Sequence, residues 1–134
     1  MRQPTPDPGA PPAAPLIAIV GVCAAGKTTL AAGLRSRGYH ARDILQEHSY
    51  VPAMWQRITR PDVLVYLDAS LAAVRQRRRD PEFPRDLYEQ ELARLRHARE
   101  HCHLYIHTDA LTPAEVLAAA LDGLARQGVM PGGR

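Results

Sequence analysis

One lysine stands among the seventeen basic residues of this chain, and it lies in a loop whose pattern is typical of phosphate binding. The loop reads Gly21-Val-Cys-Ala-Ala-Gly26-Lys27-Thr28-Thr29, and all the other basic residues are arginines. An ammonium is a compact point charge, whereas a planar guanidinium cannot take its place between terminal phosphates. The spacing G-x-x-x-x-G-K-[ST] predicts that main-chain N–H groups and Lys27 bind a polyphosphate, with Thr28 placed to ligate Mg²⁺.

The segments on either side of the loop have the patterns that such a loop needs. Residues 16–20 are an unbroken apolar run, as expected for a parallel strand buried on both faces. Residues 27–37 predict a helix, whose N-terminus supplies unpaired N–H groups and a favourable dipole for phosphate. Gly21 and Gly26 permit backbone angles and close approaches that a side chain would block. Strand, loop and helix therefore agree with phosphate binding.

The composition predicts one domain that is flanked by two tails. Residues 1–15 hold six of the twelve prolines and have no apolar periodicity, which predicts a disordered tail. Residues 128–134 predict a second unstructured tail. The domain is then 16–127, a lean nucleotide-binding domain for an α/β fold.

Strands and helices are expected to alternate along this domain. That order predicts a three-layer α/β/α architecture with a mainly parallel sheet of four to five strands. The expected strands are 16–20, 39–45, 63–67 and 104–107. The expected helices are 27–37, a short one near 52–60, 71–79, 86–101 and 113–126, with Ser70 or Asp68, Asp86 and Thr112 as candidate caps.

Charge and cysteine content narrow the partners and the compartment. The net charge of +3 could suggest nucleic acid, but the arginine clusters are poor in aromatic residues and fit phosphate handling better. No apolar run approaches transmembrane length. Cys23 and Cys102 are far apart in sequence, which favours reduced thiols and a cytoplasmic location.

Three carboxylates are candidates for chemistry. Asp43 and Glu47 follow the second strand, at the edge where open α/β sheets place their ligand crevice. Either could be the general base for an acceptor hydroxyl or an acid in the Mg²⁺ shell, and a solvated surface position is the alternative for each. Asp68 ends the strand 63–67 and could hold Mg²⁺ through water or could cap the next helix.

Cations and aromatic residues suggest further contacts. Arg75, Arg78 and Arg79 share one helical face and could neutralise charge on a transferring phosphoryl group, or form a solvated face. The segment 46–57 is rich in polar and aromatic residues, as ligand-binding loops are. For Trp55 within it, packing against the sheet is the favoured explanation.

With the loop, the segment Val63-Leu-Val-Tyr-Leu-Asp-Ala-Ser70 and the arginines after it, the chain resembles small P-loop nucleoside and nucleotide kinases. The resemblance covers about 16–125, and only the loop is specific. It implies ATP and Mg²⁺ as cofactors, Arg75 and Arg79 as lid arginines, and a lid somewhere in 79–100. The residues that it implies around ATP-Mg²⁺ are Gly21, Ala24, Ala25, Gly26, Lys27, Thr28 and Thr29.

The chain departs from the family in two respects that bear on function. The family usually has a glycine where Ala24 stands, and only a short stretch separates the second strand from Val63. A full nucleoside-monophosphate-binding domain has no room there, so a small acceptor or none is expected. Two hypotheses follow: a kinase acting on a small molecule such as a nucleoside or nucleotide, or a nucleotide-binding regulatory or accessory protein with weak or no ATPase activity.

Overall fold

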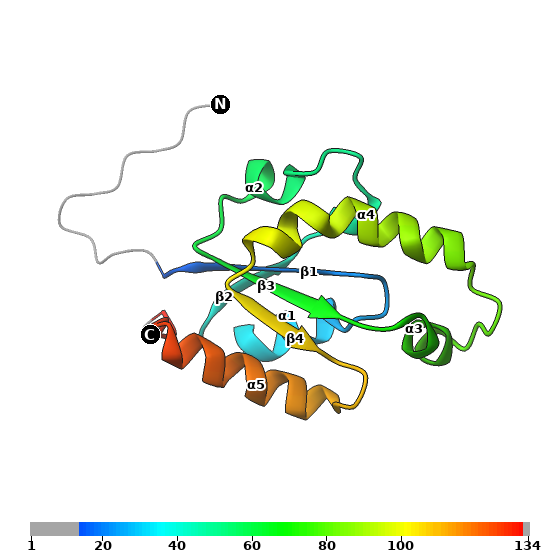
Figure 1. Cartoon of the computed structure of the whole chain (residues 1–134). Coiled ribbons are helices and arrows are strands. Elements are labelled where there is room, and N and C mark those ends of the chain that lie inside the picture. The colour runs from blue at the N-terminus through cyan, green and yellow to red at the C-terminus, as the bar shows by residue number, and fades with distance from the viewer. Residues whose placement is uncertain (1–13, 133–134) are drawn as a thin grey trace.

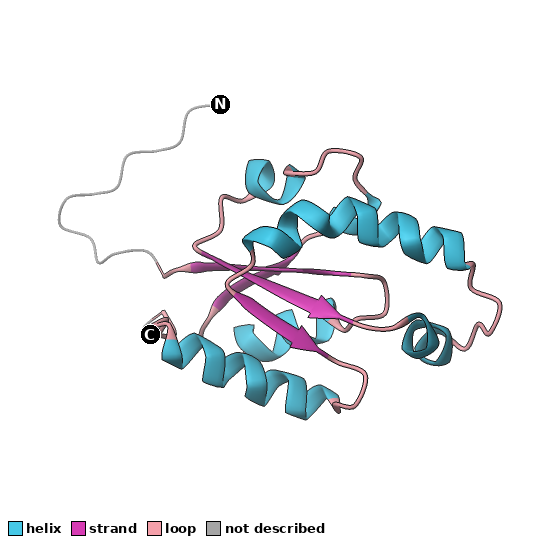
Figure 2. Cartoon of the chain, viewed as in Figure 1, coloured by secondary structure: helices cyan, strands magenta, loops and turns pink. Residues whose placement is uncertain are grey.

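A parallel sheet between two helical layers makes up the domain in the computed structural model, which describes residues 14–132 (Figures 1 and 2). The fold class predicted from the sequence is confirmed. The strands are β1 (Leu16–Gly21), β2 (His40–Asp43), β3 (Val63–Asp68) and β4 (Leu104–His107). The helices are α1 (Lys27–Arg35), α2 (Met54–Ile58), α3 (Leu71–Arg78), α4 (Arg85–His101) and α5 (Pro113–Arg126), together with a 3₁₀ turn, η1 (Gln46–His48).

The sheet of the described residues has four strands in the order β2-β1-β3-β4, and every pair is parallel. β1 and β3 occupy the middle and are buried along nearly their whole length, as their apolar runs require. The chain leaves β1 toward one edge and returns to pair β3 on the other side of β1. A crevice at the carboxyl ends of β1 and β3 follows from this reversal, and the glycine loop begins there.

Helices cover both faces of the sheet. In Figure 1, α1 and α5 lie below the sheet, α2 and α4 lie above it, and α3 lies beyond the carboxyl end of β3. The core is continuous through these layers. Its largest fully buried apolar side chains include Tyr66, Ile17, Ile19, Leu34, Leu64, Leu67, Leu95 and Leu124.

Gly21 ends β1 at a point where any side chain would collide with β3. A Cβ built on Gly21 would lie 2.3 Å from the carbonyl oxygen of Leu67, its register partner. Real Cβ atoms do not come this close to a backbone oxygen, so the pairing of the two central strands requires glycine here. The loop therefore starts from a fixed point on the sheet.

Two of the expected helix caps are present and one is replaced. The Ser70 hydroxyl accepts a hydrogen bond from the first turn of α3, and Thr112 forms a reciprocal capping box with Glu115. Asp86 was the expected cap of α4, but that helix begins at Arg85, and its N-cap is Pro84 in an extended conformation. No side chain of the described residues caps α4 at this end.

The chain beyond the sheet differs from expectation at two places. The predicted N-terminal tail lies almost wholly outside the described residues, but 128–132 pack on the domain, with Val129 buried and Gly132 N–H donating to the Gly38 carbonyl at 2.9 Å. The lid implied within 79–100 is a short turn followed by α4, which packs on the sheet through Leu95 and Ala98. Among residues 14–132, no helix combines the length and the apolar character needed to cross a membrane.

Candidate nucleotide-binding site

The glycine loop enters α1 with its first-turn amides uncommitted. Gly26 is the N-cap in a left-handed conformation, with φ 101°, and no side chain of the described residues caps the helix. The first N–H groups of a helix have no acceptor within it, so those of Lys27, Thr28 and Thr29 are available to an anion. Ala24 is also left-handed, with φ 61°, at the position where the family usually has glycine.

Two hollows border this loop. A Cβ built on Gly26 would have no atom of the described residues within 4 Å, so its surroundings are open. The first hollow, of about 260 Å³, is called the apolar hollow; it is lined by Ala24, Ala25, Gly26, Thr29, Leu30, Arg77, Thr108, Leu111, Pro113 and Val116. The second, of about 330 Å³, is called the acidic hollow; it is lined by Cys23, Ala24, Gly26, Lys27, Thr28, Thr29, Asp43, Leu45 and Glu47. Both hollows are lined by Ala24, Gly26 and Thr29.

Lys27 is buried and fully bonded in this state. Its ammonium donates to the carbonyl oxygens of Gly21 at 2.9 Å and Val22 at 3.0 Å, and it pairs with Glu47 Oε2 at 2.8 Å. These partners use all three donors of the ammonium. A polyphosphate can therefore bind Lys27 only by displacing one of them.

Glu47 is an almost completely buried acid at the loop, with 1% of its surface exposed. Its Oε1 has no hydrogen-bond partner among residues 14–132. The main chain around it is held in place because Arg94 donates to the Glu47 carbonyl at 3.2 Å. The neighbouring Gln46 is fully buried, and its side chain bonds the main chain of Val51 and Trp55. Glu47 is thus a fixed carboxylate with one uncommitted oxygen.

Asp43 lies beside the threonine that the motif assigns to Mg²⁺. Thr28 Oγ1 donates to Asp43 Oδ2 at 3.2 Å, and the Arg35 guanidinium is 3.9 Å from the other carboxylate oxygen. Within residues 14–132 no three acidic, histidine or cysteine side chains gather as a metal site. Mg²⁺ at a nucleotide needs only one or two protein oxygens besides phosphates and water. Thr28 and Asp43 fit that requirement.

Asp68, the acid expected to hold Mg²⁺ through water, lies at the carboxyl end of β3. Its carboxylate accepts a hydrogen bond from the Tyr105 hydroxyl, and its carbonyl accepts from Thr108 N–H at 2.8 Å. Burial and the bond to Asp68 raise the pKa of Tyr105 to about 12. Among the described residues Asp68 makes no bond to the glycine loop, and it does not cap α3 either. Asp43 is thus the acid that contacts Thr28 directly, and the water-mediated role of Asp68 stays a prediction.

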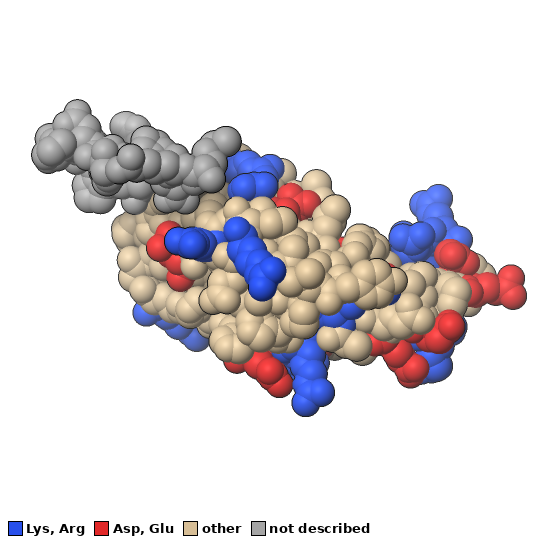
Figure 3. Space-filling view, turned by 90° about the horizontal axis from the view of Figure 1, so that it is seen from above, with Lys and Arg blue, Asp and Glu red and all other residues tan. Residues whose placement is uncertain are grey.

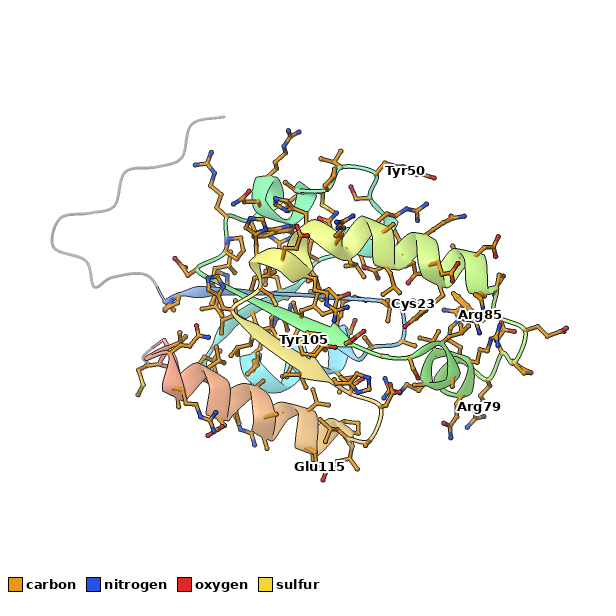
Figure 4. The ribbon with its side chains drawn as sticks, in the orientation of Figure 1. Cys23, Tyr50, Arg79, Arg85, Tyr105 and Glu115 are labelled. Atoms are coloured by element: carbon orange, nitrogen blue, oxygen red, sulfur yellow. The ribbon has the colours of Figure 1, made fainter. Side chains whose placement is uncertain are left out.

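Arg75 and Arg79, the expected lid arginines, lie at the turn between α3 and α4. Arg75 Nε donates to the Phe83 carbonyl at 3.0 Å, and Arg79 is the left-handed C-cap of α3. Figure 4 shows Arg79 projecting outward from α3, away from Cys23 in the loop. Arg78 stacks over the Phe83 ring, 4.9 Å from its centroid. These positions stabilise the turn and do not reach the glycine loop.

Arg77 is the arginine that reaches the loop. Its guanidinium donates to the Ala24 carbonyl at 3.0 Å, and to the Thr108 hydroxyl and carbonyl at 2.9 and 2.8 Å. It thereby ties the loop to the segment after β4 and forms one wall of the apolar hollow. Arg77 continues the helical face of the buried Ala73 and Val74, and this spacing was the sequence signal that could have found it.

Glu91 of α4 is a second residue that the sequence did not single out. It is 1% exposed, and its Oε1 accepts a hydrogen bond from Cys23 N–H at 2.9 Å. Burial, with the charge of Glu91 and a hydrogen bond to it, raises the pKa of the Cys23 thiol to about 11. The thiol is therefore protonated at neutral pH and is not a nucleophile. A carboxylate three residues after Tyr88 and four before Leu95, on a buried stripe, was the available signal.

The aromatic segment 46–57 packs one of its rings and exposes another. Trp55 is 4% exposed, and its Nε1 donates to His97 Nδ1 at 3.1 Å, so packing is its role here. Tyr50 is 85% exposed and lies under the Arg94 guanidinium, 4.5 Å from the ring centroid. Figure 3 views this side of the molecule and shows acidic and basic side chains intermixed over α3 and the start of α4.

Comparison with known proteins adds no family to these observations. No protein-family model matches the chain, and no curated protein matches it either. The site therefore stands on its own geometry: an uncapped helix start, a buried lysine and two hollows that meet at the loop.

Proposed function

We propose that this protein binds ATP with Mg²⁺ and transfers the γ-phosphoryl group to a small-molecule acceptor. The observation that carries the proposal is the uncapped start of α1 at Gly26, with the Lys27 ammonium beside it and two hollows that border the loop. Phosphoryl transfer depends mainly on positioning and charge neutralisation, and these groups supply both.

The two hollows differ in character, and this difference orients the nucleotide. The base and ribose belong in the apolar hollow, where Leu111 and Val116 offer apolar contact and Arg77 offers a planar cation. The phosphates belong on the loop amides and Lys27. Thr28 and Asp43 would hold Mg²⁺, which when bound neutralises charge on the phosphates.

The acidic hollow is the place for the acceptor. Glu47 is the carboxylate best placed to accept a proton there, because it is held rigidly and keeps one oxygen uncommitted. Its present bond to Lys27 would be released when the ammonium moves to the phosphates. Binding of the nucleotide that supplies the phosphoryl group would thus free the Glu47 carboxylate to act as the general base.

Nucleotide binding is tested first, by the shift in melting temperature that Mg-ATP produces. A ligand at a concentration one hundred times its Kd raises the free energy of unfolding by about 2.7 kcal/mol. For a domain of this size, that raises the melting temperature by roughly 10 °C. Neutralising the whole buried pair with Lys27→Met and Glu47→Gln should remove this shift without leaving an isolated buried charge. The matched control neutralises the exposed pair of Arg126 and Asp122 on α5, and should keep the full shift.

An unchanged ATP shift in the doubly neutralised variant would refute the assignment of the loop. Turnover is then measured as ADP release with and without candidate acceptors. Stimulation by an acceptor supports a kinase.

A nucleotide-binding regulatory or accessory protein is the second candidate. The saturated bonding of Lys27 favours it, because the ammonium starts in a closed arrangement with Glu47. The short connection between β2 and β3 also favours it, since little chain is available to enclose an acceptor. Tight ATP binding with negligible ADP release, unchanged by Asp43→Ala, selects this candidate.

A further inference from the structure

The acidic hollow is negatively charged once the nucleotide has bound. Its lining carries two carboxylates, Asp43 and Glu47, and one ammonium, that of Lys27. In the proposed function, the Lys27 ammonium binds the phosphates, and Mg²⁺ is held beside Asp43. Glu47 then remains as a buried carboxylate in the lining, and its nearest remaining partner is the His48 imidazole, whose Nε2 is 3.8 Å from Glu47 Oε2.

The nearest arginines are engaged and do not line this hollow. Arg35 Nε donates to the Ala41 carbonyl at 2.8 Å, and its guanidinium lies on the exposed side of Asp43. Arg94 donates to the Glu47 main chain and stacks on Tyr50. Recognition of a phosphate on the acceptor would need arginines or lysines pointed into the hollow. Within residues 14–132, Lys27 is the one cation in the lining.

Glu47 Oε1 indicates which group the acceptor should provide, namely a hydrogen-bond donor. A buried carboxylate oxygen without a donor is costly, and it has no partner among residues 14–132. A hydroxyl or ammonium group on a ligand would satisfy it. The hollow, of about 330 Å³, is at the small end of ligand sites.

We infer, resting on the proposed function, that the acceptor is a small unphosphorylated alcohol, neutral or positively charged, whose hydroxyl donates to Glu47 Oε1. In the transfer, the acceptor oxygen bonds to the γ-phosphorus and the bond from that phosphorus to the β-phosphate oxygen breaks. The hydroxyl proton passes to Glu47, and ADP leaves. An acceptor that already carries a phosphate is repelled by the two carboxylates of the lining, Asp43 and Glu47.

The test compares acceptors in pairs that differ by one phosphate, using the wild-type protein and Mg-ATP. Suitable pairs are uridine and its 5′-monophosphate, ethanolamine and phosphoethanolamine, and glycerol and glycerol 3-phosphate. ADP release is measured for each. We expect stimulation by the unphosphorylated member of at least one pair, and at least about tenfold less from its phosphorylated partner.

Glu47→Gln should abolish that stimulation and retain Mg-ATP binding, whereas the exposed Glu89→Gln should retain both. Preferred use of any phosphorylated member overturns the inference and leaves the proposed kinase function intact. ATP binding without stimulation by any unphosphorylated member also overturns it. Loss of ATP binding by the wild-type protein, seen in the melting experiment, is instead a failure of the proposed function.

Discussion

Replacing Glu47 with glutamine should move folding stability and nucleotide affinity in opposite directions. The Glu47 carboxylate and the Lys27 ammonium are 2.8 Å apart and almost completely buried. Removing one charge of such a pair costs about 3–5 kcal/mol when the other is left isolated. Here Lys27 keeps the carbonyls of Gly21 and Val22, and the glutamine oxygen can still accept a bond. We therefore expect a loss of about 2–3 kcal/mol, since charge-assisted hydrogen bonds are of that size.

The affinity for ATP should rise in the same variant. In the proposed function, ATP binding separates Lys27 from Glu47 and leaves a buried carboxylate near the phosphates. Glutamine removes both penalties, and recovering about half of the lost pair energy gives roughly tenfold tighter binding. Isothermal titration with a non-hydrolysable ATP analogue and Mg²⁺ measures the affinity, and urea unfolding without nucleotide measures the stability.

Glu89→Gln, on the exposed side of α4, is the matched control and should change neither quantity. Weaker ATP binding by Glu47→Gln would refute the reasoning, because it would mean that the carboxylate helps to hold the nucleotide or its metal. An unchanged urea midpoint would equally contradict the strength assigned to the buried pair.

Three further outcomes are expected. Ala24→Gly relieves a left-handed alanine and should gain roughly 0.5 kcal/mol in urea unfolding after the entropy of glycine is subtracted, whereas Ala32→Gly inside α1 should lose about 1 kcal/mol. Arg77→Ala removes the guanidinium bonds to the loop and should weaken ATP binding at least about tenfold by titration, while the outward-facing Arg79→Ala should not. Alkylation of Cys23, followed by peptide mass spectrometry, should stay slow until about pH 11 in the folded protein and should rise near pH 9.0 in denaturant. The pKa of this thiol is higher in the folded state than in the unfolded state. Its contribution to stability is therefore complete below pH 9.0 and is lost as the pH rises from 9.0 to about 11.

The elements were predictable because each depends on local patterns. The apolar runs of β1 and β3 and the cap at Thr112 are signals within a few residues, and the structure has them where the sequence placed them. The start of α4 was missed because Pro84 takes the N-cap position in place of the expected aspartate. Val129 was missed because its burial depends on packing against the finished domain.

Sequence could predict only those parts of the site that lie within one continuous segment. Lys27 and Thr28 follow from the loop pattern, and the carboxyl end of β2 drew attention to Asp43 and Glu47. Their bonds to the loop depend on the β1–β2 pairing, which local sequence does not specify. Asp68 was ambiguous because its partner, Tyr105, comes from a strand much later in the chain.

The bond from Cys23 N–H to Glu91 makes the glycine loop dependent on a helix residue that lies 68 positions further along the chain. A fragment ending after α3 would contain the whole glycine motif and both central strands, yet it would lack the carboxylate that fixes the third residue of the loop. The smallest fragment of this protein that can hold the loop amides in this arrangement therefore extends through α4. Grafting the motif with only its flanking strand and helix onto another protein would transfer the sequence but not the loop conformation.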